Sequence, residues 1–302
     1  MIILAVESSC DETAVALVRD GRTVLADCIA SSVEMHRIYG GVVPEIASRK
    51  HIEVIAQLAD QALEQAGLSR GDIDAVAVTY APGLIGAVLV GVSFAKSVAY
   101  ALGVPLIPVH HVRGHIAANY LAHPDLEPPF VCLCVSGGTS LLVDVKGYTE
   151  MEILGATRDD AAGECFDKIA RVMGLGYPGG APLDRAAQGG NDKAFSLPRV
   201  HIQDAPLDMS FSGLKTAMLN LIHNAQQKGE ELPVADLAAS FSAAVSEELV
   251  PRTMAAAQAK GYGKVAVVGG VAANSRIRRD LEQACQAAGC TLYLPPLKLC
   301  GD

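Results

Sequence analysis

The chain twice repeats one pattern, an apolar strand, a polar turn and a second apolar strand, and this repeat limits the folds it can adopt. The first copy spans residues 2–18, and its turn, Glu7–Thr13, is rich in acids and hydroxyls. The second copy spans residues 130–145 around the turn Ser136–Ser140. Backbone N–H groups in such turns can hold phosphates, and acids can hold a metal. Each turn alone is also compatible with an ordinary hairpin, but the pair predicts two similar domains that face one cleft.

Hydrophobic periodicity over the remaining residues predicts alternating strands and helices. Further strands are expected at 23–29, 73–79, 104–109, 265–268 and 291–294. Helices are expected at 45–66, 84–102, 111–121, 160–173, 214–228, 235–260 and 276–288. With 302 residues, 50% of them hydrophobic, the chain is long enough for two cores. We therefore predict an α/β protein whose two domains comprise residues 1–109 and 110–302.

The net charge of −9 argues against unspecific binding to nucleic acid, because the phosphates are repelled. The net charge does not exclude a local basic face. The candidates for one are the cluster Arg276, Arg278 and Arg279 and the pair Arg49 and Lys50. Solvated helix faces are the simpler interpretation of both clusters.

The eight cysteines form no Cys-x-x-Cys pair, and several lie within apolar runs. We therefore expect small buried thiols in a reducing compartment rather than a disulfide framework. No uninterrupted run of about 18 apolar residues occurs, so no membrane-spanning segment is predicted. In the segment Met1–Glu7, no basic residues precede the apolar run, and Glu7 ends that run too early for a signal peptide. The segment therefore predicts a buried first strand. These features favour a cytoplasmic protein.

Two histidines begin the helix expected at 111–121. His111 and His115 are four residues apart, so they lie on one helix face, one turn above the other. Two imidazoles at this spacing can bind one divalent metal ion. A pair of surface or half-buried histidines is the alternative, and the pair alone does not decide between the two.

Asn274, beyond the second turn, suggests nucleotide binding. Asn274 follows a buried strand and two glycines and precedes a helix, an arrangement that leaves room for a base or a ribose. Asp167 and Asp184 lie in a segment, 157–190, that is dense in glycine and acid. Their structural alternatives are an ion pair between Asp167 and Arg171, four residues apart, and a helix N-cap at Asp184.

Seven motifs, in this order, resemble the tRNA N6-adenosine threonylcarbamoyltransferase (TsaD) family of the ASKHA superfamily. They are Glu7–Thr13, Tyr39–Arg49, His111–His115, Asp159–Glu164, Tyr177–Gly180, Phe211–Lys215 and Gly269–Asn274. The resemblance spans the whole chain. It implies two actin-like, ribonuclease H-like α/β domains, each with a mixed sheet of five-stranded type flanked by helices, around a central cleft.

The resemblance also implies a reaction, the transfer of threonylcarbamoyl from threonylcarbamoyl-AMP to N6 of an adenosine in tRNA. That adenosine is the one 3′ of the anticodon in tRNAs that read codons beginning with A. One divalent metal, iron or zinc, is expected on His111, His115 and Asp302. Asp11, with Glu12 beside it, is implied as the catalytic acid or base. The residues implied to bind the adenylate, with ATP or ADP also able to occupy the cleft, are Cys134, Val135, Ser136, Gly137, Gly138, Asp167, Gly180, Asp184 and Asn274.

Three positions depart from the family pattern. The family commonly has Glu where this chain has Arg113, and His after the two glycines where this chain has Thr139. The family is also expected to continue beyond the Gly-Asp at Asp302 into a closing helix, which the 110–302 domain would lack. The implied metal pair is unaffected, whereas the family's histidine contact to the substrate does not carry over to Thr139.

The family implies partners: tRNA, a TsaB-like paralogue as heterodimer mate, a TsaE-like ATPase and a TsaC-like synthase of threonylcarbamoyl-AMP. Alternative functions are an ASKHA ATPase or kinase, an O-carbamoyltransferase with the same metal site, and a non-catalytic scaffold. The pair His111 and His115 argues against a scaffold, because the family's degenerate paralogue lacks it. An older label, glycoprotease, has little support, because no His-Glu-x-x-His motif occurs.

Overall fold

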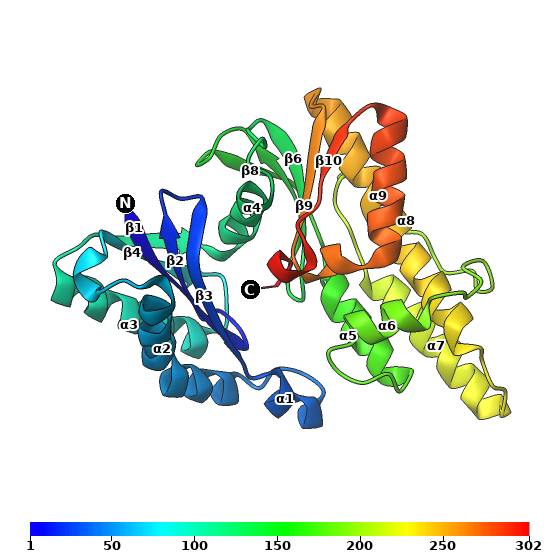
Figure 1. Ribbon diagram of the computed structural model, residues 1–302. Coiled ribbons are helices and arrows are strands. Elements are labelled where there is room, and N and C mark those ends of the chain that lie inside the picture. The colour runs from blue at the N-terminus through cyan, green and yellow to red at the C-terminus, as the bar shows by residue number, and fades with distance from the viewer. Residues whose placement is uncertain (302) are drawn as a thin grey trace. The chain divides into compact units, whose positions relative to one another are not determined.

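The computed structural model describes residues 1–301, which divide into two compact units, Met1–Pro124 and Asp125–Gly301. Each unit is built around one five-stranded mixed sheet with helices packed against it (Figure 1). Asp302, the expected third metal ligand, lies outside the described residues. This architecture confirms the predicted fold class, whereas the expected cleft stays a prediction.

Unit 1 orders its strands β3-β2-β1-β4-β5. These are β1 (Ile2–Glu7), β2 (Glu12–Arg19), β3 (Thr23–Ser31), β4 (Ala75–Ala81) and β5 (Leu106–His110). The first three pair antiparallel, and β1, β4 and β5 pair parallel, so the sheet changes pairing at β1. Alternate residues of β2 are buried, as expected for a strand with one face toward a core.

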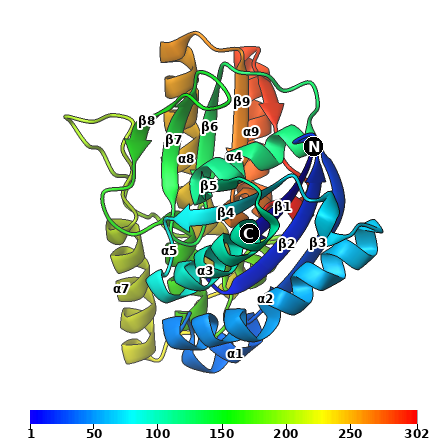
Figure 2. The same cartoon turned by 90° about the vertical axis from the view of Figure 1, so that its left-hand side faces the viewer.

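Four helices complete unit 1: α1 (Val33–His36), α2 (Pro44–Ala66), α3 (Ile85–Leu102) and α4 (His111–Ala122). Helix α2 packs on β2 and β3, α3 packs on β4, and the two helices contact each other (Figure 2). Pro44 lies in the first turn of α2 and Gly67, with φ +64°, follows its last residue, so the sequence sets both ends.

Unit 2 repeats this topology with the order β10-β9-β6-β7-β8. Its strands are β6 (Phe130–Val135), β7 (Ser140–Val145), β8 (Met151–Ala156), β9 (Lys264–Val268) and β10 (Thr291–Tyr293). Its helices are α5 (Ala162–Val172), α6 (Gly180–Ala186), α7 (Ser212–Lys228), α8 (Val234–Lys260) and α9 (Ser275–Ala288). Every residue of β6 is buried, and β6, like β1, is the strand at which pairing changes from antiparallel to parallel.

Three details differ from the sequence-based expectations. Strand β8 was not expected. Helix α6 begins at Gly180, so Asp184 lies inside it and the N-cap interpretation of Asp184 is wrong. The units divide after Pro124 rather than after Val109, because α4 packs on β4 and β5. Arg22 strengthens this packing: its guanidinium donates to the carbonyl of Tyr120 at 2.7 Å and lies over the same ring.

Helix α3 is long and apolar enough to cross a membrane by length and composition alone. Its mean hydropathy is 1.7, and only 22% of it is buried. The buried residues are small, Ala87, Gly91, Ala95 and Ala99, and they let α3 approach the sheet and α2 closely. Because a core helix can pass the same test, the absence of a membrane-spanning segment stays a prediction.

Gly91 of α3 offers a test of this close packing. A Cβ at Gly91 would lie 2.3 Å from Oγ of the buried Ser8, which itself donates to the carbonyl of Ala87. We expect Gly91→Ala to lower the free energy of unfolding by about 1–3 kcal/mol. The matched control is Gly114→Ala in α4, where the added methyl meets nothing within 4 Å. That change should be neutral or stabilising by up to about 1 kcal/mol. Equal effects of both changes in denaturant unfolding would contradict the assigned packing.

Candidate active site

The turn between β1 and β2 is held by hydrogen bonds with the start of α3. The Ser8 hydroxyl donates to the carbonyl of Ala87 at 2.9 Å, and the N–H of Leu84 donates to the carbonyl of Ser9 at 2.8 Å. These bonds bury Ser8 and Ser9 almost completely. The expected polar turn is therefore a rigid part of the unit and not a solvent loop.

The next two residues of the turn are held from α2 and from the segment before α1. The imidazole of His51 contacts the carbonyl of Cys10 at 3.0 Å. Ser32 donates twice to the carbonyl of Asp11, from its N–H at 2.8 Å and from its hydroxyl at 2.7 Å. The backbone on both sides of the Asp11 Cα is thereby fixed. This backbone sets the positions from which the half-buried side chains of Asp11 and Glu12 extend.

His111 and His115 lie one turn apart on one face at the start of α4, as the spacing predicts, with their rings edge to face. Their ring centroids lie 4.5 Å apart with the planes at 75°, and His115 is only 8% exposed. Nδ1 of His111 lies 3.1 Å from Oε2 of Glu7 and 3.1 Å from the hydroxyl of Ser9. A carboxylate on one ring nitrogen orients a metal-binding histidine and leaves Nε2 as the ligand atom.

Glu7 is suited to this supporting role. Burial would raise the pKa of its carboxyl group, but hydrogen bonds from His111, Thr79 and Ser9 and the charge of His111 lower the pKa to about 2. Glu7 therefore stays ionised. The sequence places Glu7 in the turn but does not reveal its role, because its partner His111 lies far along the chain.

The side chains around His111 and His115 supply part of a metal site. Among residues 1–301, no group of three or more His, Cys, Asp or Glu side chains is arranged to hold a metal ion. His111, His115 and the orienting carboxylate of Glu7 have the chemistry of a histidine metal site, and the expected third ligand, Asp302, is beyond the described part.

In unit 2 the glycine turn after β6 touches the start of α5. The N–H of Gly163 donates to the carbonyl of Ser136 at 3.2 Å, and the N–H of Glu164 donates to the carbonyl of Gly137 at 3.0 Å. A Cβ at Gly163 would lie 2.4 Å from the Ser136 oxygen, so only glycine permits this approach. Within residues 1–301 no acceptor contacts the N–H groups of Gly137 and Gly138, which leaves both as donors for an anion.

The other predicted adenylate residues are tied into one set of contacts in unit 2. Asp167 accepts from the N–H of Gly179 at 2.7 Å, directly before Gly180. Asp184 accepts from the N–H and the hydroxyl of Ser275 at 3.1 and 2.8 Å. Asn274 caps α9 by accepting from Ile277 at 3.1 Å. Asp184 and Asn274 are thus brought together, while Cys134 and Val135, at the end of β6, are buried in the sheet.

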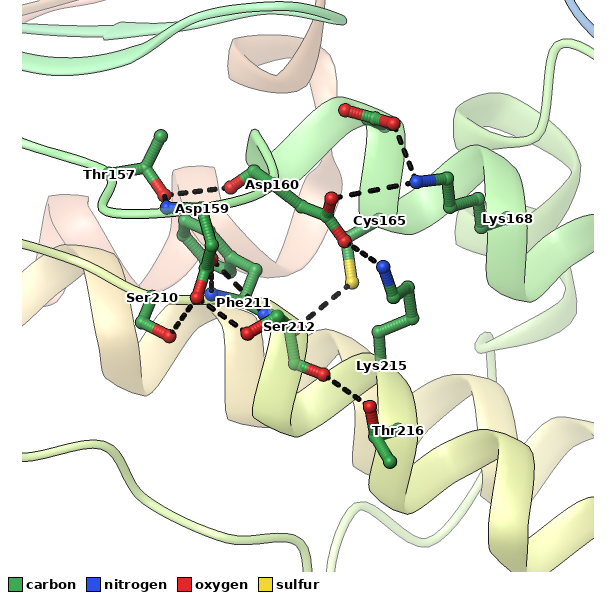
Figure 3. Close-up of polar contacts among 11 residues, drawn as sticks. Thr157, Asp159, Asp160, Cys165, Lys168, Ser210, Phe211, Ser212, Lys215 and Thr216 are labelled. Atoms are coloured by element: carbon green, nitrogen blue, oxygen red, sulfur yellow. Dashed lines mark hydrogen bonds and ion pairs between the residues drawn. The ribbon is translucent and has the colours of Figure 1, made fainter.

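Two neighbouring acids, which were not among the predicted site residues, connect the start of α5 to α7 (Figure 3). Asp159 accepts from the N–H of Phe211 at 2.8 Å and from the N–H and hydroxyl of Ser212 at 3.2 and 2.6 Å. Asp160 forms ion pairs with Lys215 and Lys168. The motifs Asp159–Glu164 and Phe211–Lys215 were the available signal. Their contact holds the loop before α5, and with it the helix that supports the glycine turn.

A cavity of about 250 Å³ in unit 2 contains none of the predicted substrate residues. It lies beside α8, and its lining combines apolar residues with the charged residues Arg199, Glu247, Glu248 and Arg252. Ion pairs join Arg252 to Glu248 and Arg199 to Glu247. These pairs are already satisfied within the unit, so we do not assign the cavity to the adenylate.

The family model of TsaD, tRNA N6-adenosine threonylcarbamoyltransferase, matches residues 23–302 of the chain. The chain belongs to this family. Two relatives of that name are those of Moorella thermoacetica, 56% identical, and Clostridium botulinum strain 657, 53% identical. In both cases the match covers 99% of this chain and 88% of the relative. The family's activity is formation of N6-threonylcarbamoyladenosine in tRNA, so the chain is a transferase of the acyltransferase class.

Solved structures with low sequence identity agree on the fold. HypF of T. kodakarensis superposes with a TM-score of 0.63 at 16% identity and covers 97% of this chain and 45% of that one. Component A of (R)-2-hydroxyglutaryl-CoA dehydratase from Acidaminococcus fermentans gives 0.56 at 16% identity, covering 98% and 92%. Both units therefore have the ASKHA-type, actin-like fold.

Asp159 provides a test of the contact between α5 and α7. Burial raises its pKa, but the hydrogen bonds from Ser210, Ser212 and Phe211 outweigh burial and lower it from 3.8. Its stabilising contribution is therefore present above about pH 3.8 and is lost as the pH falls below that value. We expect Asp159→Asn to cost about 1 kcal/mol at pH 7, a value reduced by solvent exposure. The exposed Asp204→Asn is the control, and equal unfolding curves for both variants at pH 7 would refute the contact.

Proposed function

We propose that the chain transfers threonylcarbamoyl from threonylcarbamoyl-AMP to N6 of the adenosine 3′ of the anticodon, in tRNAs that read codons beginning with A. The observation that supports this most directly is the pair His111 and His115 with Glu7 behind it, in a chain of the TsaD family. A degenerate, non-catalytic relative would have no reason to keep such a pair.

We assign the metal, iron or zinc, to His111, His115 and Asp302. When bound, it would act as a Lewis acid that polarises the carbonyl of the carbamoyl group. Glu7 and Ser9 hold His111 in one orientation, which restricts the ring nitrogen presented to the metal to Nε2. The burial of His115 keeps bulk water away from its ring.

The adenylate is assigned to unit 2. The N–H groups of Gly137 and Gly138 would donate to the phosphate, as anions bind in glycine turns. Asp184 and Asn274, brought together through Ser275, would bind the ribose and base, and Asp167 would hold the loop at Gly180. Cys134 and Val135 form the strand end from which the turn projects.

Asp11 is assigned as the acid or base, with Glu12 next to it. The exocyclic amine of adenosine is a poor nucleophile, so it must lose a proton as its nitrogen attacks the carbonyl carbon. A carboxylate on a fixed backbone can accept that proton without reorganisation. AMP then leaves with the bonding electrons of the broken carbon–oxygen bond.

Partners and location follow from the family rather than from contacts. The proposed partners are the TsaB-like paralogue, the TsaE-like ATPase and the TsaC-like synthase, in the cytoplasm. Helix α3 offers an apolar face for the paralogue, because Ile85 and Tyr100 are 90% and 91% exposed. The basic cluster is less suited to tRNA, because Arg276 pairs with Asp192 and Asp280, and Arg278 donates to two carbonyls of its own unit.

Substitution of the metal residues tests the proposal. We expect His111→Ala to lose bound metal and labelled-threonine incorporation into tRNA, since one ring cannot hold the ion. Glu7→Gln removes the anionic orienting group and should weaken metal affinity about 10–100-fold. His223→Ala, an exposed histidine of α7, is the control for both measurements. Stoichiometric metal and full activity in His111→Ala would refute the assignment.

Binding of tRNA tests the need for a partner. We expect the isolated chain to bind tRNA weakly, because its net charge is −9, and to bind tightly once the TsaB-like paralogue is added. Ile85→Glu should prevent assembly with the paralogue by charging the apolar face of α3. The control Ile153→Glu alters an exposed isoleucine of β8. Tight, salt-sensitive binding of tRNA by the chain alone would contradict the prediction.

A further inference from the structure

Two histidines of unit 1 are fully buried and have no part in the reaction assigned above. His36 is 0% exposed and His51 is 1% exposed. A buried imidazole is costly unless both of its nitrogens have partners, and here both rings meet this condition. Three of the four partners, Cys10, Thr13 and Ser32, belong to the turn that carries Asp11 or hydrogen-bond to it.

His51 contacts the turn from α2. Its Nε2 lies 3.0 Å from the carbonyl of Cys10, and its Nδ1 lies 2.7 Å from the hydroxyl of Thr13. A carbonyl can only accept, so Nε2 carries the hydrogen and Nδ1 accepts from the hydroxyl. Burial lowers the pKa of His51, while the nearby charges of Glu7 and Asp11 raise it, and the net shift is downward. The ring is therefore neutral, with its hydrogen on Nε2.

His36 reaches the same turn through one intermediate. The N–H of Val43 donates to Nδ1 of His36 at 3.2 Å, so Nδ1 is the acceptor. Nε2 then donates to the hydroxyl of Ser32 at 3.0 Å. That hydroxyl donates to the carbonyl of Asp11 at 2.7 Å. A relay thus runs from the loop before α2, through two side chains, to the residue proposed as acid or base.

We propose that His36 and His51 are positioning residues for the acyl transfer, each acting as a neutral imidazole that donates from Nε2 to fix the backbone on one side of Asp11. His51 fixes the preceding carbonyl, of Cys10, and His36 fixes the carbonyl of Asp11 itself through Ser32. The proposal rests on the assignment of Asp11 under Proposed function.

The proposal predicts different effects for substitutions that replace the Nε2 position of each imidazole and substitutions that replace only its Nδ1 position. Glutamine can place an N–H near the position of Nε2, whereas asparagine reaches only the position of Nδ1. We expect His51→Gln and His36→Gln to retain kcat within a few-fold. We expect His51→Asn and His36→Asn to lower kcat about 10–100-fold with an unchanged KM for threonylcarbamoyl-AMP, because misplacement of a catalytic group has such an effect. His223→Gln and His223→Asn are the matched exposed controls.

A second pair of variants keeps the test valid if the histidine variants fail to fold. Ser32→Ala removes the hydroxyl that links His36 to Asp11 but keeps the backbone donor, and it should lower kcat. Ser97→Ala removes an exposed hydroxyl that donates to the carbonyl of Ser93 within α3, and as the matched control it should leave kcat unchanged. Equal losses in Ser32→Ala and Ser97→Ala, or asparagine variants as active as glutamine variants, would overturn the proposal.

Failure of the Asp11 assignment is distinguishable from failure of this inference. In an Asp11→Asn background, His51→Asn should cause no further loss of kcat if both act through the same group. If Asp11→Asn alone is fully active, the acid–base assignment fails. Amide hydrogen exchange at Cys10–Glu12 then decides the positioning role, because the asparagine variants should speed exchange there and the glutamine variants should not.

Discussion

The hydrogen bonds that hold the turn Glu7–Thr13 are the constraint on which the rest of unit 1 depends. β1 is the strand at which the sheet changes from antiparallel to parallel pairing, so its end is reached from both halves of the unit. Helix α3 binds the turn at Ser8 and Ser9, α2 binds it at Cys10, and Glu7 reaches α4 at His111. A single turn thereby sets the positions of a proposed acid, a proposed metal ligand and the helices behind them.

Features that depend on local order along the chain could be predicted from sequence. The repeated strand, turn and strand pattern predicted two similar sheets, and both sheets share one order of strands. The spacing of His111 and His115 predicted that they share one face of the helix, and their ring centroids lie 4.5 Å apart in an edge-to-face arrangement. Motif order predicted the family. Such features are readable because strand alternation and helical periodicity are properties of consecutive residues.

Features that depend on distant residues could not be predicted. β8 was missed because it is an edge strand whose Glu152 and Ile153 are exposed, which leaves no buried alternation to detect. The unit boundary was placed too early because the packing of Arg22 on Tyr120 joins α4 to the first sheet. The buried histidines His36 and His51 have ordinary sequence surroundings, and only their partners in space reveal their use.

The two turns of the repeated hairpins have diverged in opposite directions. One carries carboxylates, hydroxyls and an imidazole neighbour, whereas the other carries Gly137 and Gly138, where an added Cβ would meet nothing within 4 Å. The chemistry of the first turn therefore lies in its side chains, whereas the second turn offers mainly its backbone. One substitution can remove a functional group from the first turn, whereas the second is altered chiefly by a residue that fills the space its glycines leave empty.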